Sequence, residues 1–254
     1  MAVVTGAAQG IGRRVAETLA EAGYSLALSD INESAATVAA VRSFDTEVLD
    51  VPGDVSSDSH VTALRERVLA QFGRIDVLVN NAGISLIAPA EETTAEQWRR
   101  VLEVNLTGPF LLARAFGAMM LEAGGGSIVN VASIAGLRGI ADRAAYNASK
   151  HGLVGLTRTL AAEWGGRGVR VNAVCPSWVK TEMDVVDQAS GGYSDKDIVE
   201  QVPLGRFATA ADIAAAIAFL ADPDTSGFIN GITLPVDGGW TADASWAGLR
   251  LRKR

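Results

Sequence analysis

The chain has 254 residues, of which 48% are hydrophobic and 20% charged, with a formal net charge of −7 and a pI near 4.9. This composition is that of a packed globular protein, and the acidic balance argues against non-specific binding to nucleic acids or anionic membranes. A single cysteine, Cys175, excludes an internal disulfide, and with only His60 and His151 beside it the donor set is too small for a structural zinc site, so no metal is expected.

Short runs rich in Val, Ile and Leu alternate with longer amphipathic runs along the whole chain. The short runs predict strands that are buried on both faces, at 2–6, 24–30, 47–55, 75–83, 126–133, 170–177 and 232–239. The longer runs predict helices, at 11–22, 33–42, 57–72, 94–121, 144–164 and 210–221. This alternation predicts an α/β fold: one doubly wound (Rossmann) parallel sheet of about seven strands with helices on both faces.

No Pro- or Ser-rich linker interrupts this pattern, so we expect a single domain spanning 1–254. The stretch 178–208 is the least regular, and a segment of this length inside a compact domain predicts a substrate loop or lid. No apolar run reaches the ~18 residues of a membrane span, and the N-terminus lacks a signal-peptide pattern. A cytoplasmic protein is therefore expected.

The segment TGAAQGIG (5–12) joins the first predicted strand to the first predicted helix. Gly6 can adopt the tight turn, Gly10 allows the backbone to approach a phosphate, and Gly12 allows close packing of the helix. A pyrophosphate would then lie at the helix N-terminus, where free N–H groups and the helix dipole favour an anion. The spacing differs from the commoner G-x-G-x-x-G, so the position after the first strand carries most of this prediction.

Asp30 ends the second predicted strand, 18 residues after Gly12. A carboxylate at this point can accept hydrogen bonds from the adenosine ribose and repel a 2′-phosphate. Taken alone, Asp30 could equally be a turn residue at a strand end. Neither Gln9 nor Ile31 offers a positive charge to a 2′-phosphate, so the combination favours NAD over NADP.

Tyr146 and Lys150 are four residues apart in the helical run AAYNASK, which places them on one helix face. This spacing is compatible with a solvated helix surface and with proton transfer between a phenol and its neighbour. A tyrosine has a pKa near ~10, and lowering it by ~2–3 needs about 3–4 kcal/mol, which Lys150 and a cationic nicotinamide could supply together. Ser133 ends the strand IVNVAS, where it could cap the next turn or donate to a substrate oxygen.

Six motifs occur in the order typical of the short-chain dehydrogenase/reductase family, from Val3 to about Trp240. They are TGAAQGIG, NNAG (80–83), Asn105 in EVNLTGPF, Ser133 in VASIAG, Tyr146 and Lys150 in YNASK, and VCPSWVKTEM (174–183). The chain resembles the group of about 250 residues that carries the Y-x-x-x-K signature. The family usually has Gly at the position of Ser177, so a positive φ there would strain the serine.

The resemblance implies a catalytic set in which Tyr146 is the general acid/base, Ser133 binds the substrate oxygen and Lys150 holds the nicotinamide ribose. Asn105 would kink its helix and anchor a water in a proton relay to Lys150. Asp54 would contact the adenine. The full set of implied cofactor contacts is Gly6, Gln9, Gly10, Ile11, Gly12, Asp30, Ile31, Asp54, Val55, Asn81, Gly83, Tyr146, Lys150, Pro176, Val179 and Thr181.

The predicted substrate contacts are Ser133, Ile140, Tyr146, Trp178 and Met183. Selectivity would also depend on Leu86, Ile134, Leu137, Arg138 and Arg143. Either arginine could meet a carboxylate or phosphate, or lie on a solvated rim. The sequence thus predicts an NAD-dependent oxidoreductase that interconverts a secondary alcohol and a ketone, acting as a homodimer or homotetramer. A 3-oxoacyl thioester reductase and a non-catalytic NAD-sensing protein are the alternatives.

Overall fold

The computed structural model describes residues 1–189 and 193–245, and these contain one seven-stranded parallel sheet. The strand order is β3-β2-β1-β4-β5-β6-β7. The strands are β1 Ala2–Thr5, β2 Leu26–Ser29, β3 Val48–Asp50, β4 Val77–Asn80, β5 Gly126–Val131, β6 Val169–Pro176 and β7 Thr233–Val236. Each overlaps a strand predicted from the sequence, which confirms the α/β fold class.

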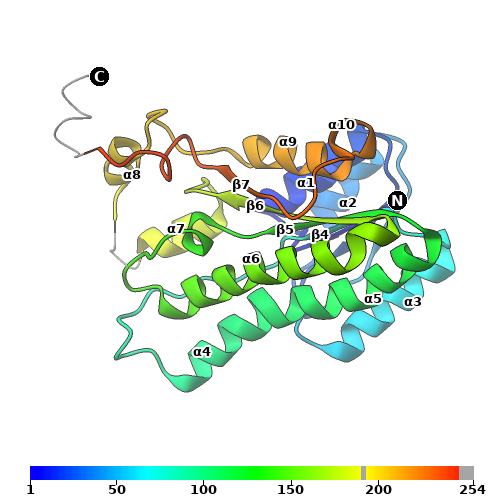
Figure 1. The fold of residues 1–254 in the computed structure, drawn as a ribbon, viewed down its shortest axis with the longest axis horizontal. Helices are drawn as coiled ribbons and strands as arrows, with labels where there is room; N and C mark the ends of the chain where they lie inside the picture. Colours follow the sequence, from blue (N-terminus) through cyan, green and yellow to red (C-terminus); the bar gives the residue numbers. More distant parts are fainter. Residues whose placement is uncertain (190–192, 246–254) are drawn as a thin grey trace.

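Helices cover both faces of the sheet, as Figure 1 shows: α1, α2, α9 and α10 lie on one side and α3, α4, α5 and α6 on the other. Their bounds are α1 Gly10–Glu21, α2 Ala35–Arg42, α3 Asp58–Phe72, α4 Ala95–Leu102, α5 Gly108–Ala123, α6 Ala144–Trp164, α9 Ala210–Ala221 and α10 Pro223–Ser226. Two apolar clusters follow this division, because successive strand residues such as Val3 and Val4 point to opposite faces of the sheet.

The helix predicted at 94–121 is interrupted in the middle. A π-helical segment, Glu103–Thr107, separates α4 from α5 and contains the buried Asn105. By length and mean hydropathy the whole stretch Ala95–Ala123 could cross a membrane, contrary to the sequence expectation. It instead contributes Leu112 and Phe116 to the core beneath the sheet, so it is a core helix.

The stretch 178–208 is more regular than the sequence indicated. It contains two short helices, α7 Glu182–Ala189 and α8 Asp195–Gln201, which lie at one end of the molecule beyond β6 (Figure 1). Ser194 caps α8 and shares a capping box with Asp197, which accounts for this helix start. Residues 190–192 of the predicted loop lie outside the described residues.

The carboxyl ends of all seven strands meet at one edge of the sheet because the strands are parallel. The order in which successive strands are added to the sheet reverses between β1 and β4. The strands β2 and β3 lie on one side of β1, and the later strands lie on the other. Open α/β sheets bind ligands in the crevice at such a switch point. The glycine turn, Asp30, Ser133 and Pro176 all follow or end strands at this edge.

Candidate active site

A cleft of about 370 Å³ opens at the carboxyl edge of the sheet. Most of the predicted site residues line it: Gly6, Gln9, Gly10, Ile11, Asp30, Ile31, Asp54, Val55, Asn81, Gly83, Ser133, Ile140, Tyr146, Lys150, Pro176, Trp178, Val179, Thr181 and Met183. Of the predicted catalytic and cofactor-binding residues, Gly12 and Asn105 do not line the cleft. The fold therefore brings the nucleotide motif and the proposed catalytic motif into one cavity.

The turn between β1 and α1 is too tight for a side chain at its glycine positions. Gly6 and Gly10 have φ angles of 65° and 55°, which glycine adopts without strain. A Cβ at Gly12 would lie 2.0 Å from the Gly6 carbonyl oxygen, so only glycine fits where α1 packs on the turn. Asn81 Nδ2 donates to the carbonyl oxygens of Thr5 and Gly6, both at 3.0 Å, and so holds the turn against the end of β4. The cradle fits a dinucleotide pyrophosphate.

Asp30 lies at the end of β2 with its carboxylate held in place by backbone donors. Its Oδ2 atom accepts from the Ala8 N–H at 3.0 Å and its Oδ1 atom from the Asn32 N–H at 2.9 Å. Asp30 is only 8% exposed, whereas the adjacent Ile31 is 64% exposed. A fixed negative charge with an apolar neighbour is the environment expected where ribose hydroxyls bind and a 2′-phosphate does not.

Asp54, at the predicted adenine end, pairs with Arg100 from α4 at 2.8 Å and accepts from the Ser56 hydroxyl at 2.7 Å. Burial raises the pKa of this carboxyl, but the Ser56 hydrogen bonds and the Arg100 guanidinium outweigh burial and hold the pKa below its usual range. The arginine closes the adenine end of the cleft and was not anticipated from the sequence.

Lys150 lies in α6 and is almost completely buried, with 4% of its surface exposed. Its Nζ atom donates to the Val131 carbonyl at 2.8 Å and lies 5.6 Å from the centre of the Tyr146 ring. Burial is the main cause that lowers the pKa of Lys150 to about 8. The solvated-surface interpretation of the Tyr–Lys pair is therefore wrong, because the lysine faces the interior.

The predicted lowering of the Tyr146 pKa by Lys150 and a cationic nicotinamide together stays a prediction, and burial in the protein acts against it. Burial raises the pKa of Tyr146, and the lowering effects of the Ser133 hydroxyl and the Arg143 guanidinium do not compensate for it. Asp187 raises the pKa of Tyr146 further. The sequence argument counted the charge one helical turn away but not the desolvation of the pair, which favours the uncharged form of both groups.

Ser133 has the first of the two functions that its position allowed, and its donation to a substrate oxygen stays a prediction. Its Oγ atom accepts from the Ala135 N–H at 3.1 Å and so caps the short 3₁₀ turn Ile134–Gly136. The same hydroxyl faces Tyr146, where it favours the phenolate form and lowers the phenol pKa. Capping fixes the hydroxyl beside the phenol, where a substrate oxygen can reach both.

Asn105 is fully buried in the π-helical segment and forms hydrogen bonds with the loop that follows β4. Its Oδ1 atom accepts from the Ile84 N–H and its Nδ2 atom donates to the Ile84 carbonyl, both at 2.9 Å. A Cβ at Gly83 would lie 3.3 Å from Asn105 Oδ1 and 3.7 Å from Lys150 Nζ, so the asparagine and the lysine flank this glycine. The predicted helix distortion at Asn105 is present, and its part in a proton relay stays a prediction.

The comparisons with known proteins agree with this arrangement. Residues 6–241 match the short-chain dehydrogenase family described as enoyl-(acyl carrier protein) reductase. The D-threitol dehydrogenase of Mycolicibacterium smegmatis is 46% identical, over 95% of this chain and 92% of that protein. The cis-4-hydroxycyclohexanecarboxylate dehydrogenase of Sinomonas cyclohexanicum is 43% identical, over 95% and 96%. The crystal structure of levodione reductase superimposes with a TM-score of 0.91 at 37% identity, over 95% and 97%.

The chain belongs to the short-chain dehydrogenase/reductase family. It is an NAD(P)-dependent oxidoreductase that acts on CH–OH groups. The family usually has glycine where this chain has Ser177, but the serine is not strained. Among the described non-glycine residues, only Asp45 and Asp142 have a positive φ.

The substrate end of this short-chain dehydrogenase has an apolar wall. Ile140, Trp178 and Met183 line the cleft as predicted, and Trp178 packs edge-on against Trp240, with ring centres 5.4 Å apart. Ile134 and Arg143 also line it. The other three selectivity candidates, Leu86, Leu137 and Arg138, lie outside the cleft that the described residues form.

The cleft also has a polar wall, whose individual residues were not predicted from the sequence. Asp184, Asp187 and Tyr193 from the α7–α8 segment line the cleft, although only the segment as a whole was expected to do so. They carry no periodic pattern or motif that would identify them. Within the described residues, no group of three or more His, Cys, Asp or Glu side chains could hold a metal ion.

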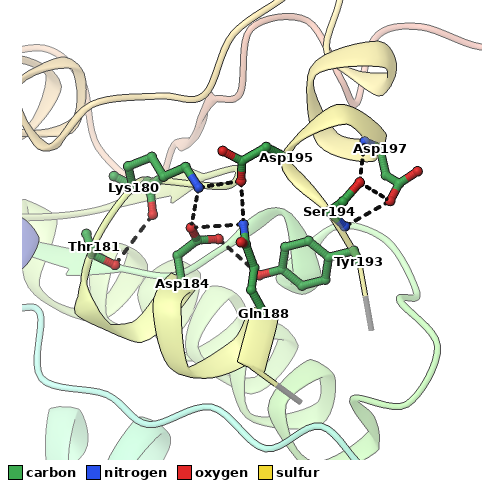
Figure 2. Close-up of polar contacts among 9 residues, drawn as sticks. Lys180, Thr181, Asp184, Gln188, Tyr193, Ser194, Asp195 and Asp197 are labelled. Atoms are coloured by element: carbon green, nitrogen blue, oxygen red, sulfur yellow. Dashed lines mark hydrogen bonds and ion pairs between the residues drawn. The ribbon is translucent and has the colours of Figure 1, made fainter. Parts of the chain in front are cut away.

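A polar network stabilises this segment, as Figure 2 shows. Asp184, which is 6% exposed, accepts from the Tyr193 hydroxyl at 3.1 Å and pairs with Lys180 at 3.1 Å. Lys180 also pairs with Asp195, and Gln188 donates to the same carboxylate at 2.7 Å. These contacts tie α7 to the start of α8 and so fix the polar wall of the cleft.

Proposed function

We propose that this protein is an NAD-dependent oxidoreductase that interconverts a secondary alcohol and a ketone. The observation that carries the proposal is the convergence of Ser133, Tyr146 and Lys150 on the cleft that also holds the glycine turn. A binding protein without catalytic activity has no need of a phenol and a buried amine at this point. We propose further that residues 1–254 form one catalytic domain in a cytoplasmic homo-oligomer.

In the direction of oxidation, Ser133 and Tyr146 bind the substrate hydroxyl through hydrogen bonds, and Tyr146 removes its proton. A nicotinamide held in this cleft would supply the hydride acceptor for the carbinol carbon. Lys150 stabilises the phenolate form of Tyr146 that accepts the proton and would orient the ribose, while Asn105 holds the adjacent loop. In the reverse direction Tyr146 returns the proton to the ketone oxygen, so the same residues act as acid and base.

The preference for NAD rests on Asp30. Its fixed carboxylate and the apolar, exposed Ile31 leave a 2′-phosphate facing a negative charge without a cationic partner. The variant that combines Asp30→Ser with Ile31→Arg is expected to raise kcat/KM for NADP⁺ relative to NAD⁺ by at least about tenfold, since it removes a like charge and adds an opposite one. A parent enzyme that already prefers NADP⁺ would contradict the assignment.

The substrate class is supported by the shape of the cleft and by the relatives. The apolar wall around Trp178 suits a carbon skeleton of a few atoms, and the two relatives most identical to the chain among those described above are named for a tetritol and a hydroxycyclohexanecarboxylate. The description of the matching family names acyl carrier protein, which favours reduction of a 3-oxoacyl thioester as a second candidate.

The deciding experiment measures initial rates with both dinucleotides across aliphatic alcohols, cyclic alcohols, polyols and 3-oxoacyl thioesters. Tyr146→Phe is the matched variant, because it removes only the hydroxyl. It is expected to retain NADH binding and to lose about 10²-fold to 10⁴-fold in rate. If the parent enzyme binds NADH but turns over none of these compounds, the NAD-sensing alternative replaces the enzyme assignment.

A further inference from the structure

The polar wall of the cleft contains a cluster formed by three separate segments. Arg143, at the start of α6, donates from Nη1 to the Ser85 hydroxyl at 2.8 Å and from Nη2 to Asp187 Oδ2 at 2.9 Å. The Ser85 hydroxyl in turn donates to the same carboxylate oxygen at 3.2 Å. Ser85 comes from the loop after β4 and Asp187 from α7, so the cluster joins the body of the fold to the α7–α8 segment.

This cluster lies next to the reacting groups. The Arg143 guanidinium carbon is 5.9 Å from the centre of the Tyr146 ring, and Arg143 and Asp187 both line the cleft with Tyr146. A substrate whose carbinol oxygen is bound by Tyr146 and Ser133 therefore extends toward the cluster with its next few carbon atoms. The cluster is therefore positioned to bind the substituents of those carbon atoms.

Two observations indicate that the cluster is not explained by a gain in stability of the fold. The side chains of Arg143 and Asp187 are only 11% and 13% exposed, and removing two charges from water costs more than their attraction usually returns. The residue before the arginine, Asp142, has a φ of 59°, a conformation that is unfavourable for a residue with a side chain. Its carbonyl accepts from the Ala88 N–H at 2.8 Å, which holds this bend in place.

We propose that Arg143 and Asp187, positioned by Ser85, form a subsite that binds a second hydroxyl group of a neutral, polyhydroxylated substrate and rejects a carboxylate at the same point. This inference rests on the proposed oxidation of a secondary alcohol. A hydroxyl group can donate to Asp187 while it accepts from Arg143, whose planar fork has five N–H donors. A carboxylate can only accept, and it would stand beside the buried charge of Asp187.

The same geometry argues against the alternative in which Arg143 recognises a carboxylate or phosphate. The arginine already has an internal carboxylate partner, so the cluster as a whole is close to neutral. A substrate anion would have to displace Asp187 from the guanidinium. Neutral diols and polyols, linear or cyclic, can bind without breaking the pair.

The test compares three types of secondary alcohol on two carbon skeletons, with NAD⁺ as oxidant. The linear set is threitol, 2-butanol and 3-hydroxybutyrate, and the cyclic set is 1,4-cyclohexanediol, cyclohexanol and 4-hydroxycyclohexanecarboxylate. Within each set the members differ in whether they offer a further hydroxyl, no polar group or a carboxylate. We expect kcat/KM for the hydroxylated member of the preferred set to exceed that for the carboxylate by at least about tenfold.

Asp187→Asn keeps the shape of the side chain but removes its charge. It is expected to reduce the preference for the neutral substrate by at least about tenfold, because the repulsion of a carboxylate is lost and Arg143 gains a free positive charge. Ser85→Ala changes no charge, and it should lower kcat/KM for the hydroxylated substrate but not for the monoalcohol. NADH affinity and the thermal unfolding temperature show whether each variant is folded.

Glu200→Gln is the matched control, since it removes a carboxylate from the same segment at a position that pairs with the exposed Lys196 and lies outside the cleft. It should leave the substrate preference unchanged. A parent enzyme that prefers the hydroxy acids, or an Asp187→Asn enzyme with the parent preference, would overturn the subsite alone. Absence of turnover on all six alcohols, with NADH still bound, would overturn the proposed function and the subsite together.

Discussion

Replacing Lys150 by methionine is expected to stabilise the cofactor-free protein while it abolishes turnover. The lysine is 4% exposed, and burial lowers its pKa from 10.5 to about 8. At neutral pH this difference corresponds to about 3 kcal/mol that the folded state loses by holding the ammonium. Methionine has a similar unbranched stem, so it fills the same space without a charge.

Part of this gain is offset by a lost hydrogen bond. Lys150 Nζ donates to the Val131 carbonyl at 2.8 Å, and methionine cannot replace this donor. An unsatisfied buried acceptor costs about 1–3 kcal/mol. We therefore expect Lys150→Met to be more stable than the parent by up to about 2 kcal/mol at pH 7, the difference between these two contributions.

The gain should depend on pH in a defined direction. The folded pKa of Lys150 lies below the unfolded one, so between about pH 8 and 10.5 the unfolded parent binds more protons than the folded parent. The contribution of Lys150 to the stability of the parent therefore rises across that window. The stability advantage of the methionine variant shrinks accordingly as the pH rises. Burial raises the pKa of Cys175 to about 11, which lowers stability above pH 9 in both proteins. Because Lys150 counteracts this rise in the parent, the loss is larger in the methionine variant and reduces its advantage further at high pH.

Urea unfolding of both proteins at pH 7, 8, 9 and 10, without dinucleotide, measures the midpoint and the slope m. An unchanged m together with a higher midpoint shows a change in stability alone. Lys180→Met is the control, because this lysine is 44% exposed and its removal relieves no buried charge, so it should not stabilise the protein. The reasoning fails if Lys150→Met is less stable than the parent at pH 7, or if the difference does not vary with pH.

Three further substitutions test the geometry of the site. Gly12→Ala places a Cβ 2.0 Å from a backbone oxygen of the glycine turn and should abolish NADH binding in a fluorescence titration, whereas Gly166→Ala, with open space around it, should not. Ser177→Gly should destabilise the protein by up to about 1 kcal/mol in thermal unfolding, because the serine is unstrained and glycine adds chain entropy; a stabilised variant would contradict this. Trp240→Ala removes the edge contact with Trp178 and should raise KM for the alcohol by about threefold to tenfold at constant NADH affinity, and an unchanged KM would speak against a role for this contact.

The fold could be predicted because its local signals agree with its tertiary arrangement. Strands such as Ala2–Thr5 and Val77–Asn80 are buried at every position, so they appear as continuous apolar runs bounded by turns. The interruption of the helix at Glu103–Thr107 could not be predicted in this way. The π-helical segment places Asn105 against the backbone of Ile84, and that contact depends on how α4 lies on the loop after β4.

The candidate site could likewise be predicted from the sequence only in part. Asp30 and Ser133 follow strand ends, and parallel strands bring all such positions to one edge, so topology alone placed them in the cleft. Ser85 and Asp187 lie in irregular or weakly patterned sequence and are 102 residues apart, so no local signal joins them. The opposing effect of burial on the pKa of Tyr146 was also not anticipated, because it depends on burial depth rather than on the distance to the nearest charge.

Burial connects the stability cost of this site to its chemistry. In the protein alone, desolvation disfavours both the ammonium of Lys150 and the phenolate of Tyr146, so the pair favours its neutral forms. The ammonium of Lys150 and the phenolate of Tyr146 would attract each other most strongly in the same dry environment. A positive charge brought next to the phenol, as in an oxidised nicotinamide, would shift the balance toward phenolate at the moment when the alcohol must lose its proton. A solvated Tyr–Lys pair on the helix surface would avoid the desolvation cost and would also weaken this attraction.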